Sequence, residues 1–224
     1  LPKDSIINLR IFKELTNFYW DAPYFINDHH VALAYFGEYN DQSFKMISKV
    51  PDSFESLVTK SRESDSLDYW FKGAVLDSIK FELEIQDTLR IKTAYSKEPI
   101  NDSLIVKIFN KGSLRLKEKL ELESNLPITK VDSSKIKVTN IDTLPISASL
   151  KILENFDRIR VDFDVLPSDK YTVTLLPNAL QDFWGRTHDS LIFKITTRKI
   201  EDYGNIYLSV QHDTPYPMIL ELLK

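Results

Sequence analysis

The residues whose types could support hydrolysis are His188, Asp189 and Ser190, which follow one another in the chain. They are the three residue types of a hydrolase triad, in which a base activates a nucleophile and a third group orients that base. Adjacent residues cannot adopt this geometry, and no Gly-x-Ser-x-Gly sequence supplies a nucleophile elsewhere. We interpret the stretch as a hairpin loop that enters a strand, and we predict no catalytic residue.

Two adjacent histidines, His29 and His30, raise the question of a metal site. Neighbours on an extended segment point to opposite faces, so they cannot easily share one ion. The other histidines, His188 and His212, are distant in sequence, and the chain has no cysteine. Its five glycines form no phosphate-binding cluster. We therefore predict no metal and no cofactor.

Clustered carboxylates, such as those between Asp65 and Asp68, leave two further alternatives open. Two of them could form a glycosidase pair, and an acidic loop could hold an adventitious calcium ion. A sheet edge rich in Asp and Glu is normally a solvated face, and we favour that interpretation. An enzyme would need titratable residues that converge in one cleft.

Aromatic residues give the strongest functional indication. Tyr69, Trp70 and Phe71 are consecutive, so a strand must direct at least one of these rings away from its core. Exposed rings bind sugars or partner proteins. The candidate contact residues are Trp20, Tyr24, Trp70 and Trp184. In the alternative interpretation, most of these rings fill the sandwich ends or the junction between domains.

Composition limits the class of protein. The chain has 224 residues, of which 42% are hydrophobic and 28% charged, and its net charge is -4. This length suits two domains of about 100 residues each. No apolar run approaches the ~20 residues that a membrane-spanning helix needs. Lys and Glu are interleaved without a basic stripe, so nucleic acid is not a predicted partner.

The elements that position these residues are predicted to be strands. Tyr171–Leu175 is rich in β-branched and aromatic residues, and 191–197 alternates apolar and polar side chains. Between them, Ala179, Leu180 and Phe183 have helical spacing, and Gly185 permits a reversal of the chain. Further strands are predicted at 31–36, 44–47, 65–71, 78–85, 88–93, 101–109, 135–138, 147–150 and 158–165.

Two segments have ambiguous patterns. Asp52 and Glu55 form a capping-box pair, so we predict one short helix that ends near Lys60. The segment 114–123 is rich in helix formers, but its leucines at 114, 116, 120 and 122 all fall on one face of a strand. We therefore predict a strand there. The fold class is all-β, with tandem antiparallel β-sandwiches and one short helix.

Four predicted strands follow an Asp-Ser pair, at Asp4, Asp77, Asp102 and Asp189. Aspartate and serine side chains can bond nearby backbone donors in turns. We interpret the pair as a signature of a turn that opens onto a strand.

The Tyr171-Thr172-Val173 start, Asp182 with Gly185, and the Phe193–Thr197 ending resemble the last two strands of the Ig-like domain named after the S-layer protein SbsA. One departure is Arg186, which stands where that family usually carries asparagine. Upstream, 114–128 and 131–138 look like its opening strands, so the resemblance covers roughly 114–197.

A wider similarity is to large Bacteroidetes outer-membrane lipoproteins with such modules. It lies in Asp65–Phe71, in the repeated Asp-Ser starts and in Asp202–Asn205. The resemblance implies a location at the outer membrane, through an anchor outside this chain. Both ends are interpreted as cuts in a longer protein. The predicted parts are 1–16 as a preceding strand or linker, 17–110 and 111–198 as two sandwich domains, and 199–224 as the start of a following module.

The expected function is non-enzymatic. The resemblance implies a scaffold or partner-binding segment of a cell-envelope lipoprotein, with other envelope or outer-membrane proteins as partners. The alternative is a carbohydrate-binding or glycan-processing accessory module, which would need a planar row of exposed rings including Trp70 or Trp20.

Overall fold

The computed structural model describes residues 18–37, 44–61, 64–85, 88–96, 103–109 and 113–204. These ranges contain nineteen strands and two one-turn 3-10 helices, with no α-helix among them, so the predicted all-β class is confirmed. Within the same ranges no helix is long and apolar enough to cross a membrane. The predicted strand after Asp4 and the segment 205–224 lie outside the described residues.

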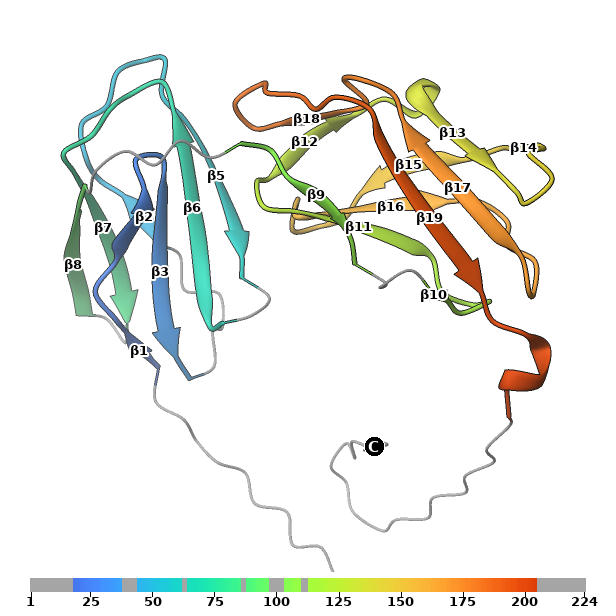
Figure 1. The fold of residues 1–224 in the computed structure, drawn as a ribbon. Helices are drawn as coiled ribbons and strands as arrows, with labels where there is room; N and C mark the ends of the chain where they lie inside the picture. Colours follow the sequence, from blue (N-terminus) through green and yellow to red (C-terminus); the bar gives the residue numbers. More distant parts are fainter. Residues whose placement is uncertain are drawn as a thin grey trace, which may run out of the picture.

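The first sandwich consists of β1 to β8 (Figure 1). Its larger sheet contains β1 (Tyr19–Trp20), β2 (Tyr24–Asn27), β3 (His30–Phe36), β5 (Glu55–Lys60) and β6 (Ser66–Lys72). Its smaller sheet contains β4 (Lys45–Met46), β7 (Ser78–Ile85) and β8 (Thr88–Tyr95). Every pairing is antiparallel. Ile79, Phe81 and Leu83 are fully buried, as their alternation with charged residues predicts.

The second sandwich consists of β9 to β19. One sheet has the order β10 (Ser113–Leu114), β19 (Leu191–Thr197), β17 (Lys170–Leu175), β13 (Ile136–Thr139) and β14 (Pro145–Ile146). The facing sheet has the order β15 (Ser149–Ile152), β16 (Arg158–Asp162), β11 (Leu120–Ser124) and β9 (Val106–Ile108). A third pair joins β12 (Ile128–Val131) to β18 (Leu180–Asp182).

This strand order is that of an immunoglobulin-like domain. The sheet β9, β11, β16 and β15 corresponds to strands A, B, E and D, while β13, β17 and β19 correspond to C, F and G. The two sheets bury a common core that includes Leu122, Ile159 and Val173, none of them accessible to solvent. The second sandwich is Ig-like.

Tyr171 holds the loop that precedes its own strand. Its ring is buried, and its hydroxyl accepts a hydrogen bond of 2.7 Å from the backbone N–H of Leu166. A tyrosine near the start of strand F that bonds back to the upstream backbone is typical of Ig-like domains.

Tyr171→Phe is expected to lower the free energy of unfolding by about 1–3 kcal/mol, because it leaves the N–H of Leu166 without its acceptor. Denaturant titration of the full chain measures this loss. Tyr203→Phe is a matched control, since the Tyr203 hydroxyl also accepts a backbone N–H, from Leu116, but at an exposed position. If both variants lose the same stability, burial of Tyr171 does not explain the loss in Tyr171→Phe.

Two tyrosines make stability sensitive to alkali. Burial raises the pKa of Tyr69 above 10.0, more than its hydrogen bond with Ser56 lowers it, and burial likewise raises the pKa of Tyr171. Because each tyrosine has a higher pKa in the folded than in the unfolded state, its contribution to the free energy of unfolding is complete below pH 10. That contribution is lost as the pH rises through the folded pKa. Urea titrations above pH 9 should show Tyr69→Phe losing stability less steeply than the wild type. Equal slopes would contradict this expectation.

The predicted helix from Asp52 to Lys60 is wrong. The backbone N–H of Phe54 bonds to the carbonyl of Pro51, which closes a turn, and Glu55–Lys60 then pairs with β6 as strand β5. A six-residue ladder and the burial of Thr59 outweigh the local capping signal. The backbone at Gly73, after β6, passes close to the turn at Ser53. Only glycine fits there, since its φ is +85° and a Cβ would lie 2.1 Å from the Ser53 carbonyl oxygen.

Three other features refine the sequence interpretation. The helical spacing around Leu180 is overridden, because Leu180–Asp182 pairs with β12 as strand β18. The segment 114–123 is extended, as predicted, but a turn closed by the Glu118 N–H and the Arg115 carbonyl interrupts it. Strand β9 pairs with β11, so we propose that the domain division lies before Val106 rather than after residue 110.

Candidate functional site: the junction between the sandwiches

The turn after β18 lies on the side of the second sandwich that faces the first (Figure 1). Trp184 in this turn contacts β6. Its indole N–H donates a hydrogen bond of 3.1 Å to the carbonyl of Phe71 in β6. Its ring meets that of Trp70 edge-on, with centroids 5.9 Å apart. Trp70, Leu126 and Phe183 are buried together here, with Leu57, Leu104 and Trp184 packed against them. This apolar cluster joins the two sandwiches.

Lys72 adds a charged contact beside the cluster. Its ammonium group donates to the Phe183 carbonyl at 3.2 Å and lies 4.7 Å from the centroid of the Phe183 ring. It also forms an ion pair of 3.0 Å with Glu55. Lys72 of β6 therefore contacts both the backbone and the ring of Phe183 in the second sandwich.

A separate clamp is formed by Asn155. Its Oδ1 accepts from the backbone N–H of Lys60 at 2.9 Å, and its Nδ2 donates to the Lys60 carbonyl. These are the two bonds that a neighbouring strand would make to the edge of β5. The adjacent Phe156 has a φ of +60°, an uncommon conformation for a bulky residue. Phe156 adopts this conformation in the hairpin between β15 and β16, where Asn155 contacts the first sandwich.

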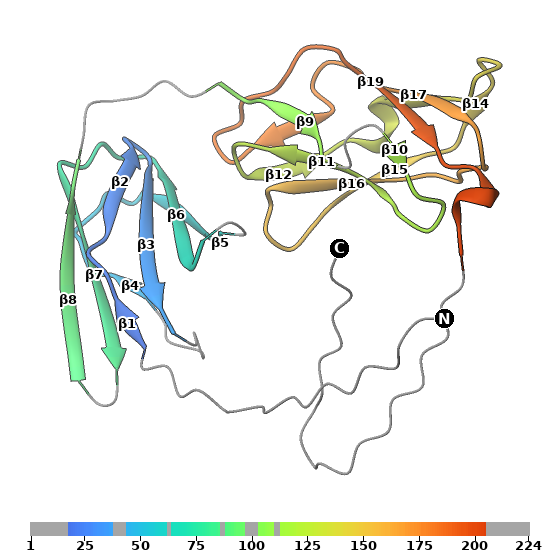
Figure 2. The same cartoon turned by 60° about the horizontal axis from the view of Figure 1, so that its bottom comes forward.

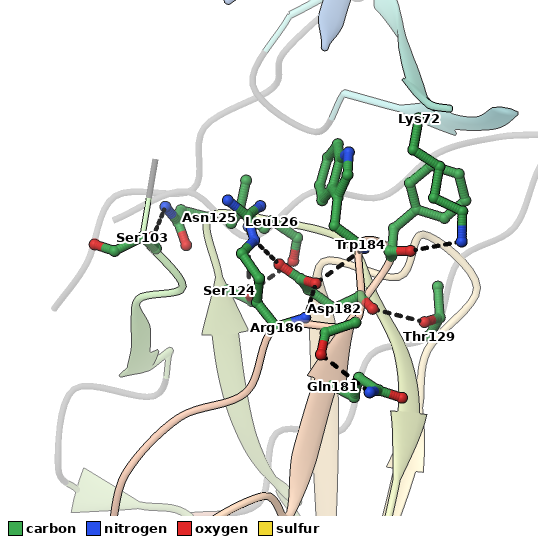
Figure 3. A network of polar contacts seen from close by, with 12 residues as sticks. Lys72, Ser103, Ser124, Asn125, Leu126, Thr129, Gln181, Asp182, Trp184 and Arg186 are labelled. Carbon is green, nitrogen blue, oxygen red and sulfur yellow. Dashed lines mark hydrogen bonds and ion pairs between the residues drawn. The ribbon is translucent and has the colours of Figure 1, made fainter. Parts of the chain in front are cut away.

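Asp182 holds the Trp184 turn in shape (Figure 3). Its side chain is 0% exposed. Oδ1 accepts from the backbone N–H groups of Trp184 at 2.9 Å and Arg186 at 2.8 Å, and Oδ2 accepts from the Arg186 Nε at 2.7 Å. Gly185 between them has a φ of +88°. Arg186, which stands where the SbsA-type domains usually carry asparagine, pairs its guanidinium with this buried carboxylate.

The histidines contact different groups. His30 stacks on Trp70 at 3.6 Å between ring centroids and bonds to Asp68 at 2.8 Å, whereas His29 faces the Trp184 ring. His188 is buried, and its Nε2 accepts from the backbone N–H of Leu180. Among the described residues no group of three or more His, Cys, Asp or Glu could hold a metal. Each of these three rings has a structural contact.

The structure separates the four predicted contact residues. Trp20 is 1% exposed, because its pairing with Tyr35 directs it into the core, where it packs on Phe44. Trp70 is 8% exposed, because the second sandwich covers its face of β6. The prediction of exposed rings at these two positions is wrong. Trp184 is half-buried at the junction, while Tyr24 is 49% exposed. The alternative, rings that fill the sandwich ends or the junction, describes Trp70 and Trp184 at the junction, whereas Trp20 lies in the core of the first sandwich.

Sequence reasoning missed Lys72 and Asn155. Lys72 ends an ordinary strand, and Asn155 lies in a hairpin, so neither breaks the local pattern of residue types. Their roles depend on how the two sandwiches meet. The one available signal was the aromatic pair Phe183 and Trp184 in a predicted loop.

No protein-family model matches this chain, and no curated protein matches it. Solved structures of tandem domains are similar in outline. The titin Ig tandem domains A164-A165 share 8% identity over 81% of this chain and 97% of that chain, with a TM-score of 0.28. Domains 5-6 of the S-layer protein SbsC share 11% identity over 82% of this chain and 100% of that chain, with a TM-score of 0.27. The Ig-like assignment of the second sandwich rests on its strand order.

Proposed function

We propose that this chain is a non-enzymatic, rigid two-domain segment of a large cell-envelope lipoprotein, and that it serves as a scaffold or partner-binding part of an outer-membrane assembly. The observation that carries the proposal is the junction. An apolar cluster, an indole hydrogen bond, a lysine contact and the Asn155 clamp link the sandwiches at separate points. Relative motion of two domains is the default unless their interface resists it.

Two contacts on different strands resist two kinds of motion. Trp184 engages β6, whereas Asn155 engages the edge strand β5. A hinge about either contact alone would break the other. The junction therefore supports a fixed spacing between surfaces of the two domains, which is what a scaffold needs.

The envelope location rests on the resemblance to SbsA-type modules and outer-membrane lipoproteins. The partners proposed are other envelope proteins, and membrane attachment is proposed through an anchor outside this chain. The glycan-binding alternative is not favoured, because its required row of rings included Trp70 or Trp20, and both are buried.

Affinity capture of the intact, membrane-extracted parent protein from its own cells tests the proposal. We expect envelope proteins in stoichiometric amounts with the wild type, and a marked loss with the double variant Asn155→Ala, Trp184→Ala. Lys151→Ala, at an exposed position in β15, is the control and should capture as the wild type does. Capture of the bait alone would contradict the proposal and direct the next experiment to glycan arrays with a Tyr24→Ala control.

A further inference from the structure

Strand β8 forms an open edge of the first sandwich. It ends the sheet order β4-β7-β8, on the side of that sandwich away from the second one (Figure 1, Figure 2). Strand β2 lies near it at the corner of the sandwich but pairs with β3 instead. Within the described ranges no strand pairs with this edge of β8. An unpaired edge offers its backbone groups to a strand from another chain.

The hydrogen-bond pattern of β8 determines which backbone groups face this edge. The Ser96 N–H donates to the Asp77 carbonyl at 2.8 Å, and bonded and non-bonded pairs alternate along an antiparallel ladder. The even-numbered residues of β8 therefore bond to β7. The odd-numbered residues turn their N–H and C=O groups toward the open edge, and they are Leu89, Ile91, Thr93 and Tyr95. None of the described residues forms a hydrogen bond with these outward groups.

The odd-numbered residues also form an apolar row on the outer face of the sheet. Leu89, Ile91 and Tyr95 are 56%, 54% and 72% exposed, whereas Ala94, from the alternate set, is buried in the core. Alternate side chains of a strand lie along one line on the same face. The edge therefore combines unpaired backbone groups with apolar side chains, which are the two kinds of contact that an added strand makes.

Two cations on the inner face of β8 restrict the choice of partner. Arg90 is exposed, and the Lys92 ammonium group donates to the Trp20 carbonyl. If a second copy paired antiparallel along all four outward residues, Lys92 of each copy would lie opposite the other, and like charges directly opposite are destabilising. A strand with acidic residues at these positions is attracted instead. The charges therefore favour a different protein over a second copy.

We propose that the edge of β8 binds an extended strand of another protein, in which apolar residues alternate with acidic ones. The apolar side chains of that strand lie beside Leu89, Ile91 and Tyr95, and its carboxylates lie opposite Arg90 and Lys92. Main-chain hydrogen bonds supply the affinity of an added strand, and its alternate side chains supply the specificity. That the partner is an envelope protein rests on the proposed function, but the surface itself is separate from the junction.

Binding of a synthetic peptide to the full chain tests the inference. The probe is Val-Ser-Val-Glu-Val-Glu-Val, and the control probe has lysine in place of both glutamates. We expect fluorescence anisotropy to give an affinity about tenfold higher for the glutamate peptide. Hydrogen exchange followed by NMR should show that saturation with this peptide protects the amides of Ile91 and Thr93, which are unprotected in the free chain.

Variants of the chain separate the contributions to binding. Ile91→Pro removes an outward N–H that β7 does not use, and it should weaken binding about tenfold. Ile91→Thr keeps this N–H and is the control, with an expected change of less than about threefold. Arg90→Glu should reduce the preference for the glutamate peptide. The double variant Asn155→Ala, Trp184→Ala should bind the peptide as the wild type does, so a failure at the junction is distinguishable from a failure at β8.

Three results would overturn the inference. Equal affinities for the two peptides would show that Arg90 and Lys92 select nothing. Equal binding by Ile91→Pro and Ile91→Thr would show that the peptide does not pair with the edge. Protection of the Ile91 and Thr93 amides that grows with the concentration of the chain alone would assign the edge to a second copy instead. Circular dichroism of each variant establishes that it is folded.

Discussion

Replacing Asp182 by alanine is expected to lower the free energy of unfolding by about 3 kcal/mol. The carboxylate is fully buried and accepts three hydrogen bonds, two from backbone N–H groups and one from the Arg186 guanidinium. Alanine leaves these donors without their acceptor and removes the charge that balances Arg186. Chemical denaturation of the full chain measures the loss.

Two variants separate the causes of this effect. Asp182→Asn keeps one oxygen acceptor but turns an amide donor toward the Arg186 Nε, so an intermediate loss of about 1–2 kcal/mol is expected. Asp164→Ala, at an exposed aspartate, should change stability by less than about 0.5 kcal/mol. If Asp182→Ala also stays within that limit, the carboxylate does not hold the turn.

Trp70→Ala is expected to cost about 3–4 kcal/mol, in the range of large-to-small substitutions of buried aromatic residues. Trp70 donates its indole N–H to the Thr59 hydroxyl at 2.9 Å, stacks on His30 and meets Trp184 edge-on. Alanine removes all three contacts and opens a cavity between the sandwiches. Calorimetry is the direct measurement, because separate melting of the two sandwiches would appear as a second transition.

Matched variants make the Trp70 result interpretable. Trp70→Phe retains most of the ring and should lose less, mainly the hydrogen bond to Thr59. Val58→Ala lies on the same sheet at an exposed position and should be close to neutral. A neutral Trp70→Ala variant would mean that the apolar cluster contributes little to holding the domains together.

Local periodicity predicts most of this fold, because a strand with one buried face repeats every two residues. Strands β7, β17 and β19 follow directly from their alternation. The segment 55–60 does not, since its capping signal is real but weaker than a six-residue ladder with β6. Strand β18 is similar, because Leu180–Asp182 becomes a strand by pairing with β12, which is distant in sequence.

The candidate site was harder to predict for a physical reason. The alternation of Tyr69, Trp70 and Phe71 predicts that at least one ring lies on the face away from the core, and in the structure that ring is Trp70. Whether that face is exposed to solvent or buried depends on the second sandwich. The periodicity of a strand carries no information about contacts with another domain. The resemblance drew attention to Asp182 and Gly185, and the structure supplies their role in shaping the Trp184 turn. Nothing in the local sequence marks Asn155.

The measurement that tests the central claim most directly is a distance distribution between two spin labels, one in each sandwich. Leu89→Cys and Lys194→Cys carry the labels at exposed positions, and the absence of native cysteine makes labelling unique. Labels at Lys151→Cys and Lys194→Cys, both in the second sandwich, give the width of a rigid body. The account predicts a single peak between the sandwiches of the same width, which broadens when Asn155 and Trp184 are both replaced by alanine. A broad or multiple distribution in the otherwise unsubstituted chain would contradict a rigid junction.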